Sequence, residues 1–95
     1  MPGYLIVELD YEDSSWAEAY GREVPSLIAA HGGRYLARTS RTELLEGDRG
    51  PSFITAILEF PSLDVAKAFL ASEDYRPFAQ ARRSAGAKTR ILGVS

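Results

Sequence analysis

The order of strand-like and helix-like segments constrains this chain more than any single motif. Runs rich in aliphatic and aromatic residues, the first of them alternating, are typical of strands, and two stretches with helical spacing separate them. The expected strands span residues 4–10, 34–39, 53–60 and 89–94. The order is therefore strand, helix, strand, strand, helix, strand, which is the order of the ferredoxin-like βαββαβ fold.

The first helix is expected to begin at a capping box and to end at a pair of glycines. Ser15 is followed three residues later by Glu18, a pattern that satisfies two helix-end donors reciprocally. Pro25 lies inside the helix, so we expect a kink there or two shorter helices. Gly32 and Gly33 have the backbone freedom that a left-handed cap requires. Apolar and aromatic residues recur at spacings of three and four, at Trp16, Tyr20, Val24, Leu27, Ile28 and His31.

The second helical region is expected in two pieces. Ser62 is the predicted N-cap of the first piece, and Ser72 opens the second, which spans residues 73–84.

The second strand is expected either to end at Thr39 or to continue through residues 42–46 after a bulge. Right-handed crossovers are expected to place strands one and three side by side and parallel in an otherwise antiparallel four-stranded sheet, with both helices on one face.

A sheet that carries helices on one face only leaves the other face bare. We expect one domain over residues 1–95, and a chain of this size buries only about 60–65% of the surface that it exposes when unfolded. The bare face therefore favours association with a second copy. The sequence predicts an α+β homodimer joined through this face.

Composition excludes several classes of partner and site. Eleven basic and thirteen acidic residues give a net charge of −2, which provides no field for binding nucleic acid. The absence of cysteine excludes disulfides and thiolate chemistry, and a single histidine does not make a zinc site. No apolar stretch approaches the roughly 18 residues of a membrane span, and the first ten residues have no signal-peptide pattern. We expect a cytoplasmic protein with no metal, cofactor, nucleic acid or membrane partner.

Four segments resemble a known family in their order and spacing. They are GGRYLAR at 32–38, LEG at 45–47, LEFPS at 58–62 and SEDY at 72–75, preceded by Val24-Pro25. Together they resemble domain-of-unknown-function family 1330 over essentially the whole chain. The resemblance implies a dimeric α+β barrel, in a superfamily with cofactor-free monooxygenases, lactone isomerases, haem-handling enzymes and proteins of no known activity. It implies no catalytic residue, because the family has no established reaction.

Two carboxylates are candidate acid–base groups. The strand alternation places Glu8 and Glu59 on the face turned away from the helices, and neighbouring strands would bring them onto the same buried surface. Desolvated carboxylates often act as acid or base. Alternatively, Arg38, Arg90 or the partner chain neutralises each carboxylate in a structural ion pair.

His31 is the only side chain whose ordinary pKa lies near neutrality. It is a candidate general base at the mouth of a cleft between the first helix and the sheet. Its alternative role is structural, because the helix macrodipole favours a histidine at a helix C-terminus.

Aromatic residues are candidates for a ligand pocket. Trp16, Tyr20 and Tyr35 supply flat apolar surface, as does Tyr4 on the other face of the first strand, although aromatics at helical spacing are also common in a core. Arg38 is a candidate for holding negative charge on a ligand.

These observations leave two functions open. One is a cofactor-free enzyme that acts on a small aromatic or carbonyl-containing metabolite, with His31, Glu8, Glu59 and Arg38 as its catalytic candidates. The other is a non-catalytic module for small-molecule binding or assembly. The chain contains no nucleophile elbow, phosphate loop or dinucleotide fingerprint that would favour a named chemistry.

Overall fold

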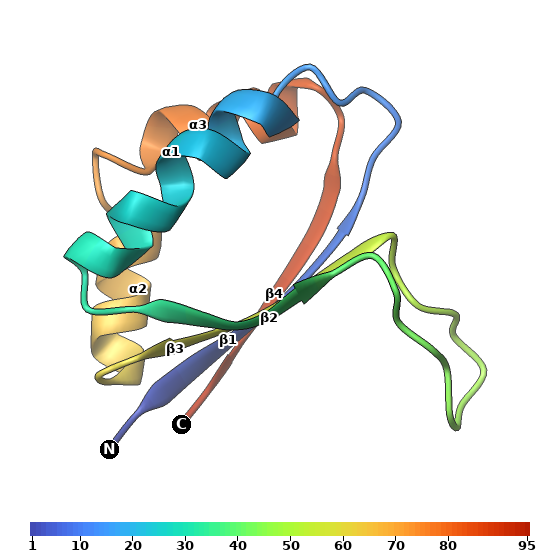
Figure 1. The fold of residues 1–95 in the computed structure, drawn as a ribbon, viewed down its shortest axis with the longest axis horizontal. Coiled ribbons are helices and arrows are strands. Elements are labelled where there is room, and N and C mark those ends of the chain that lie inside the picture. The colour runs from blue at the N-terminus through green and yellow to red at the C-terminus, as the bar shows by residue number, and fades with distance from the viewer.

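The structure, a computed structural model, describes residues 1–95 and contains four strands and three helices (Figure 1). In chain order the elements are β1 (Gly3–Asp10), α1 (Ala17–Ala30), β2 (Arg34–Thr39), β3 (Ile54–Phe60), α2 (Leu63–Leu70), α3 (Arg76–Ser84) and β4 (Lys88–Val94). None of the helices is both long enough and apolar enough to span a bilayer. The predicted ferredoxin-like order is confirmed, with the second helical region divided in two as expected.

The sheet has the strand order β2-β3-β1-β4, and every neighbouring pair is antiparallel. The expectation that strands one and three run parallel is therefore wrong. The crossover through α1 makes β1 and β2 parallel but leaves a gap between them. The chain then turns back after β2, so β3 fills the gap and runs antiparallel to both neighbours.

All three helices lie on one side of the sheet (Figure 1). The inner sheet face presents Leu5 and Leu9 from β1 and Ala56, Leu58 and Phe60 from β3, which are buried as the alternation predicted. The helices bury Val24, Ile28, Ala66 and Phe69 against them. The core therefore lies between the helical layer and one sheet face, and the opposite face of the sheet has no covering element.

Helix α1 begins differently from the prediction. Its N-cap is Trp16, which makes no side-chain capping bond, so the predicted capping box of Ser15 and Glu18 is wrong. The Ser15 N–H instead donates to Asp13 Oδ1 at 2.9 Å, because a short turn precedes the helix. The helix is also continuous through Pro25, so the alternative of two shorter helices is wrong.

The end of α1 has the predicted glycine cap. Gly32 has φ +77°, its N–H donates to Ala29 O at 2.9 Å, and the Gly33 N–H donates to Ile28 O at 2.9 Å. This pair of bonds is a Schellman motif, which satisfies carbonyls that the helix leaves free. It fixes the direction in which the chain enters β2.

The two later helices begin at serine and proline signals. Ser62 Oγ accepts from the Val65 N–H at 3.1 Å, which confirms Ser62 as the N-cap of α2. Ser72 Oγ accepts from the Tyr75 N–H at 3.3 Å, but α3 begins only at Arg76. Pro77 explains the later start, because proline is tolerated only in the first turn of a helix.

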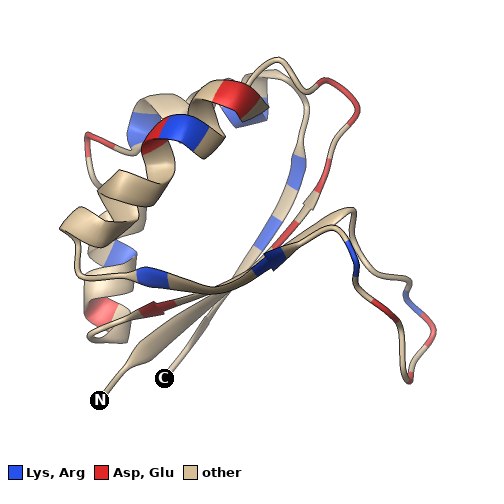
Figure 2. Ribbon diagram, in the orientation of Figure 1, with Lys and Arg blue, Asp and Glu red and all other residues tan.

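The segment between β2 and β3 is a loop that projects beyond the sheet (Figure 1). The alternative that the second strand continues through residues 42–46 is wrong, because no strand is present there. Leu45 has 86% of its surface exposed, so this region packs against no neighbouring strand. Acidic and basic residues are interspersed along the loop and α1 (Figure 2), so neither sign forms a continuous patch on these elements.

Candidate functional site

A cavity of about 320 Å³ lies between the helical layer and the inner face of the sheet. It is lined by 21 residues, of which 16 are hydrophobic. Ala17 and Gly21 of α1 and Ala56 of β3 are among them, and the small size of these residues leaves space that larger residues would fill. The size and apolar lining are those of a small-molecule site.

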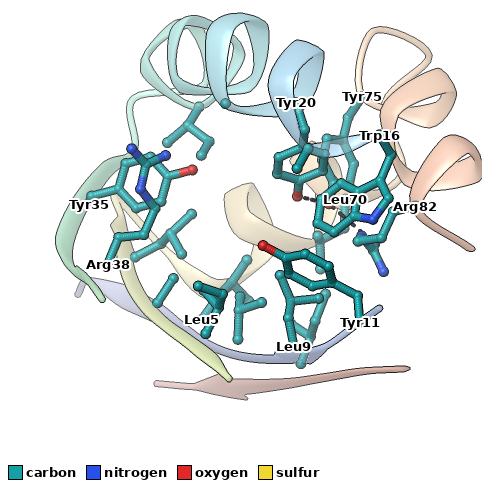
Figure 3. A pocket seen from close by; sticks show the side chains of 18 of the residues that line it. Leu5, Leu9, Tyr11, Trp16, Tyr20, Tyr35, Arg38, Leu70, Tyr75 and Arg82 are labelled. Carbon is teal, nitrogen blue, oxygen red and sulfur yellow. Dashed lines mark hydrogen bonds between the residues drawn. The ribbon is translucent and has the colours of Figure 1, made fainter. Parts of the chain in front are cut away.

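Aromatic side chains form one wall of the cavity (Figure 3). The Trp16 ring meets Tyr11 edge-on at 4.9 Å between centroids and Tyr20 at 5.3 Å. The Tyr20 and Tyr75 hydroxyls are 2.6 Å apart and share a hydrogen bond. These contacts hold four rings in place, so a flat ligand would meet a rigid surface.

Arg82 extends this wall from α3. The residue is only 3% exposed, and its guanidinium donates to Thr89 Oγ1 and, over 3.5 Å, to the Tyr75 hydroxyl. None of the ion pairs in the structure involves Arg82. A guanidinium stays charged at every relevant pH, so the cavity wall contains a buried positive charge with no carboxylate beside it.

Arg38 and Tyr35 lie across the cavity from this wall (Figure 3). The Arg38 guanidinium lies over the Tyr35 ring, 5.0 Å from its centroid. Arg38 is exposed and therefore solvated, in contrast to Arg82. The two arginines thus occupy opposite sides of the cavity in different environments.

Two tyrosines of the cavity, Tyr20 and Tyr35, have a raised pKa and can donate a hydrogen bond to a ligand at neutral pH. Burial, and then the neighbouring Tyr75, raise the pKa of Tyr20 far above its ordinary value. Burial also raises the pKa of Tyr35, although Arg38 acts in the opposite direction. The lining contains no carboxylate and no imidazole. The site can therefore bind a substrate oxygen through neutral phenols and cationic guanidinium groups.

Four of the predicted site residues line this cavity, namely Trp16, Tyr20, Tyr35 and Arg38. Tyr4 does not, because it pairs with Glu59 across β1 and β3 on the face away from the helices. The structure thus brings together three of the four ligand-binding candidates and one of the four catalytic candidates. Their functional roles stay predictions.

Glu8 and Glu59 share the open sheet face but do not lie together. Glu8 is opposite Thr55, whereas Glu59 is opposite Tyr4, which puts them roughly 13 Å apart along the sheet at about 3.3 Å per residue. The register thus puts the two carboxylates on the same face, as predicted, but separates them along it.

Each of these carboxylates is paired with arginine, Glu8 with two side chains and Glu59 with one. Glu8 Oε2 lies 3.5 Å from Arg49 and 3.7 Å from Arg90, and Glu59 Oε1 lies 3.0 Å from Arg34. The expected ion pair with Arg90 is present, whereas Arg38 pairs with neither carboxylate. Both side chains lie outside the cavity, on the face opposite to it.

His31 is the C-cap of α1 and does not line the cavity. Its Nδ1–H donates to Leu27 O at 2.9 Å, and its ring packs edge-on against Phe69 at 5.4 Å. This placement matches the structural alternative for His31, since both contacts anchor the helix end.

Arg82 and Tyr11 are cavity residues that sequence reasoning missed. Tyr75, Ala79 and Arg82 follow one another at spacings of four and three residues, which puts them on one side of a helix, and all three are buried. That spacing was the available signal, but arginine in a helix is usually solvated. No group of three His, Cys, Asp or Glu side chains is placed to bind a metal.

Comparison with known proteins identifies the family. The model of the family "Domain of unknown function (DUF1330)" matches residues 2–94. The chain belongs to this family. No curated protein matches the chain.

Solved structures share the fold of this DUF1330 protein at low sequence identity. A protein of unknown function from Rhodopseudomonas palustris has a TM-score of 0.75 and 17% identity, over 98% of this chain and 80% of that one. A variant of SnoaB, a cofactor-independent oxygenase from Streptomyces nogalater, has a TM-score of 0.66 and 18% identity, over 99% of this chain and 91% of that one. A conserved protein from Methanosarcina mazei has a TM-score of 0.53 and 13% identity, over 97% and 92%.

Proposed function

We propose that this DUF1330 protein binds a small, largely aromatic metabolite in the cavity and converts it without a cofactor. The observation that carries the proposal is the cavity of about 320 Å³, which is mostly apolar and contains a few converging polar groups. The fold shared with SnoaB, a cofactor-independent oxygenase, supports an enzyme over a passive binder. At this identity the likeness is one of fold alone, so the substrate has to be argued from the cavity.

The cavity residues divide into two roles in this proposal. The rings of Trp16 and Tyr20 hold the flat body of the ligand, and Arg38 stabilises negative charge that develops on a ligand oxygen. Of the residues expected to be catalytic, only Arg38 lines the cavity, so the proposal retains it and omits His31, Glu8 and Glu59. If the reaction removes a proton from the substrate, no carboxylate or imidazole of the cavity lining accepts it.

A thermal-shift screen of hydroxylated and carbonyl-containing aromatic compounds tests binding, because a ligand of the native state raises the apparent stability. Compounds that bind are then followed for turnover in air without added cofactor. Tyr20→Leu, which removes the ring, should weaken binding, whereas Tyr4→Leu, the same change on the opposite sheet face, should not. A screen without a single hit would refute the proposal and leave an assembly module as the function.

We also propose that the chain forms a homodimer, a dimeric α+β barrel, through the open sheet face. Ile6 pairs with Ile57 on one side and with Leu92 on the other, which makes an apolar strip across three strands. Leu92 is 41% exposed in the single chain. A monomer that leaves such a strip in water is disfavoured, and a second copy of the same face would cover it.

Sedimentation velocity at micromolar protein tests the dimer. The wild-type chain should sediment with twice the mass of one chain. Leu92→Lys should weaken association at least tenfold, because it puts a charge in the strip. Leu45→Lys, the same change in the projecting loop, is the control. A wild-type monomer at this concentration would refute the dimer.

A further inference from the structure

The buried guanidinium of Arg82 needs negative charge that the protein does not supply. Its two hydrogen-bond partners, Thr89 and Tyr75, are neutral hydroxyls, and the residue is only 3% exposed. Neutral partners satisfy some of the five donors of a guanidinium but leave its charge uncompensated. Burying an unpaired charge is costly, and proteins usually pair such a charge with a carboxylate. Arg82 lines the cavity, so a ligand there can supply the missing anion.

Trp16 provides a second, independent observation at the same wall. Its indole Nε1 is buried and has no hydrogen-bond partner, although the residue lines the cavity. Leaving a buried donor unpaired is unfavourable, and nearly all such groups in folded proteins have a partner. Trp16 is joined to Arg82 through the Tyr20 and Tyr75 rings. The wall therefore contains a buried positive charge without an anion and a buried N–H donor without an acceptor.

We propose that the ligand of the cavity is a flat aromatic molecule with a single anionic oxygen group, a carboxylate or a phenolate, and that Arg82 binds this group. The inference rests on the proposed function of the cavity and adds its ligand class. The anionic group lies at the Arg82 wall, where the Trp16 N–H is an additional donor. The rest of the ligand extends across the sheet floor toward Arg38. Charge-assisted hydrogen bonds to a guanidinium are the strong kind and define the orientation of the ligand.

Arg82 differs in this respect from Arg38, the other arginine of the cavity. Arg38 is exposed and lies on the Tyr35 ring, so water and the ring compensate its charge. An anion gains less by displacing that water than by meeting a guanidinium that has already lost its hydration. Arg82 is therefore the stronger anion site of the two.

Calorimetric titration with 2-naphthoate and 2-naphthamide tests the inference, because the two probes share a shape and differ in charge. The wild-type protein should bind the acid at least tenfold more tightly than the amide. Arg82→Gln should abolish that preference and leave amide binding within about twofold. Trp16→Phe should weaken binding of the acid by a smaller factor than Arg82→Gln does. Arg83→Gln, an exposed arginine on the same helix, should behave as wild type.

The outcomes separate this inference from the proposed function. Equal binding of the two probes to the wild type would refute the anionic ligand while leaving the cavity a binding site. A preference that survives Arg82→Gln but is lost in Arg38→Gln would refute the role of Arg82. If neither probe binds, the inference fails, while hits of another chemistry in the thermal-shift screen would keep the proposed function. The wild-type comparison decides the ligand class even where Arg82→Gln fails to fold.

Discussion

Filling the cavity should stabilise the protein and at the same time block its site. Ala56 lies in the middle of β3, is 6% exposed and lines the cavity. Ala56→Leu adds three carbon groups that extend into the open volume of about 320 Å³. Each buried CH₂ contributes about 0.8 kcal/mol, and ordering a leucine side chain costs roughly 0.5–1 kcal/mol. The net gain in the free energy of unfolding is therefore about 1.5 kcal/mol.

The same substitution in a filled part of the core is the matched control. Ala66 of α2 is 0% exposed, belongs to the core and does not line the cavity. Ala66→Leu should therefore destabilise the protein by about 1–3 kcal/mol, because no space exists for the added atoms. Both variants replace a buried alanine with leucine, and they differ in whether free space surrounds the new side chain.

Urea unfolding and thermal melts measure both effects. For a domain of this size a gain of about 1.5 kcal/mol raises the Tm by roughly 6–12 °C. Binding of any cavity ligand to Ala56→Leu should fall at least tenfold, since the added side chain occupies its place. If Ala56→Leu destabilised the protein as much as Ala66→Leu does, the reasoning would be refuted, because the supposed cavity would then be filled.

Three further substitutions test the surroundings of the site. Phe69→Ala should lower the free energy of unfolding by about 3–5 kcal/mol in urea titrations, because Phe69 is 2% exposed; a loss below about 1 kcal/mol would contradict this packing. Ser62→Ala should cost about 1 kcal/mol by removing the cap of α2, and no change would contradict the cap. Tyr20 keeps its proton in the folded state when the unfolded chain, with an ordinary pKa near 10, loses it. The contribution of Tyr20 to the free energy of unfolding should therefore be fully present below pH 10 and should decrease as the pH rises further. The decrease with pH should be shallower in Tyr20→Phe than in the wild type. Equal slopes for the two proteins would contradict burial of this phenol.

Local patterns predicted most of the fold because the physics behind them is local. The alternation along β1 requires that Leu5 and Leu9 face the same way, whatever the rest of the chain does. Gly32 and Gly33 predicted the end of α1 because the Schellman motif involves only residues of the last turn. The start of α1 was mispredicted because Ser15 lies in a turn that Asp13 closes, and a four-residue pattern does not distinguish the two arrangements.

The site was less predictable because it depends on register and on packing between layers. Glu8 and Glu59 lie on the predicted face, but their separation follows from the register of β1 and β3, which the long loop before β3 does not reveal. Trp16 and Tyr20 were predicted as ligand residues because their rings supply flat apolar surface, and both line the cavity. The helical spacing from Tyr75 and Ala79 puts Arg82 on the inward side of α3, but its guanidinium is held inside by Thr89 and Tyr75, and no local pattern specifies those contacts.

The position of Trp16 gives the protein a built-in optical reporter. It is the only tryptophan of the chain, it is buried, and it forms part of the cavity wall. Indole emission shifts in colour with the polarity around the ring, so its spectrum follows whatever enters or leaves this space. A simple fluorimeter can therefore detect occupancy in the unmodified chain, with no label attached and whatever the natural ligand is.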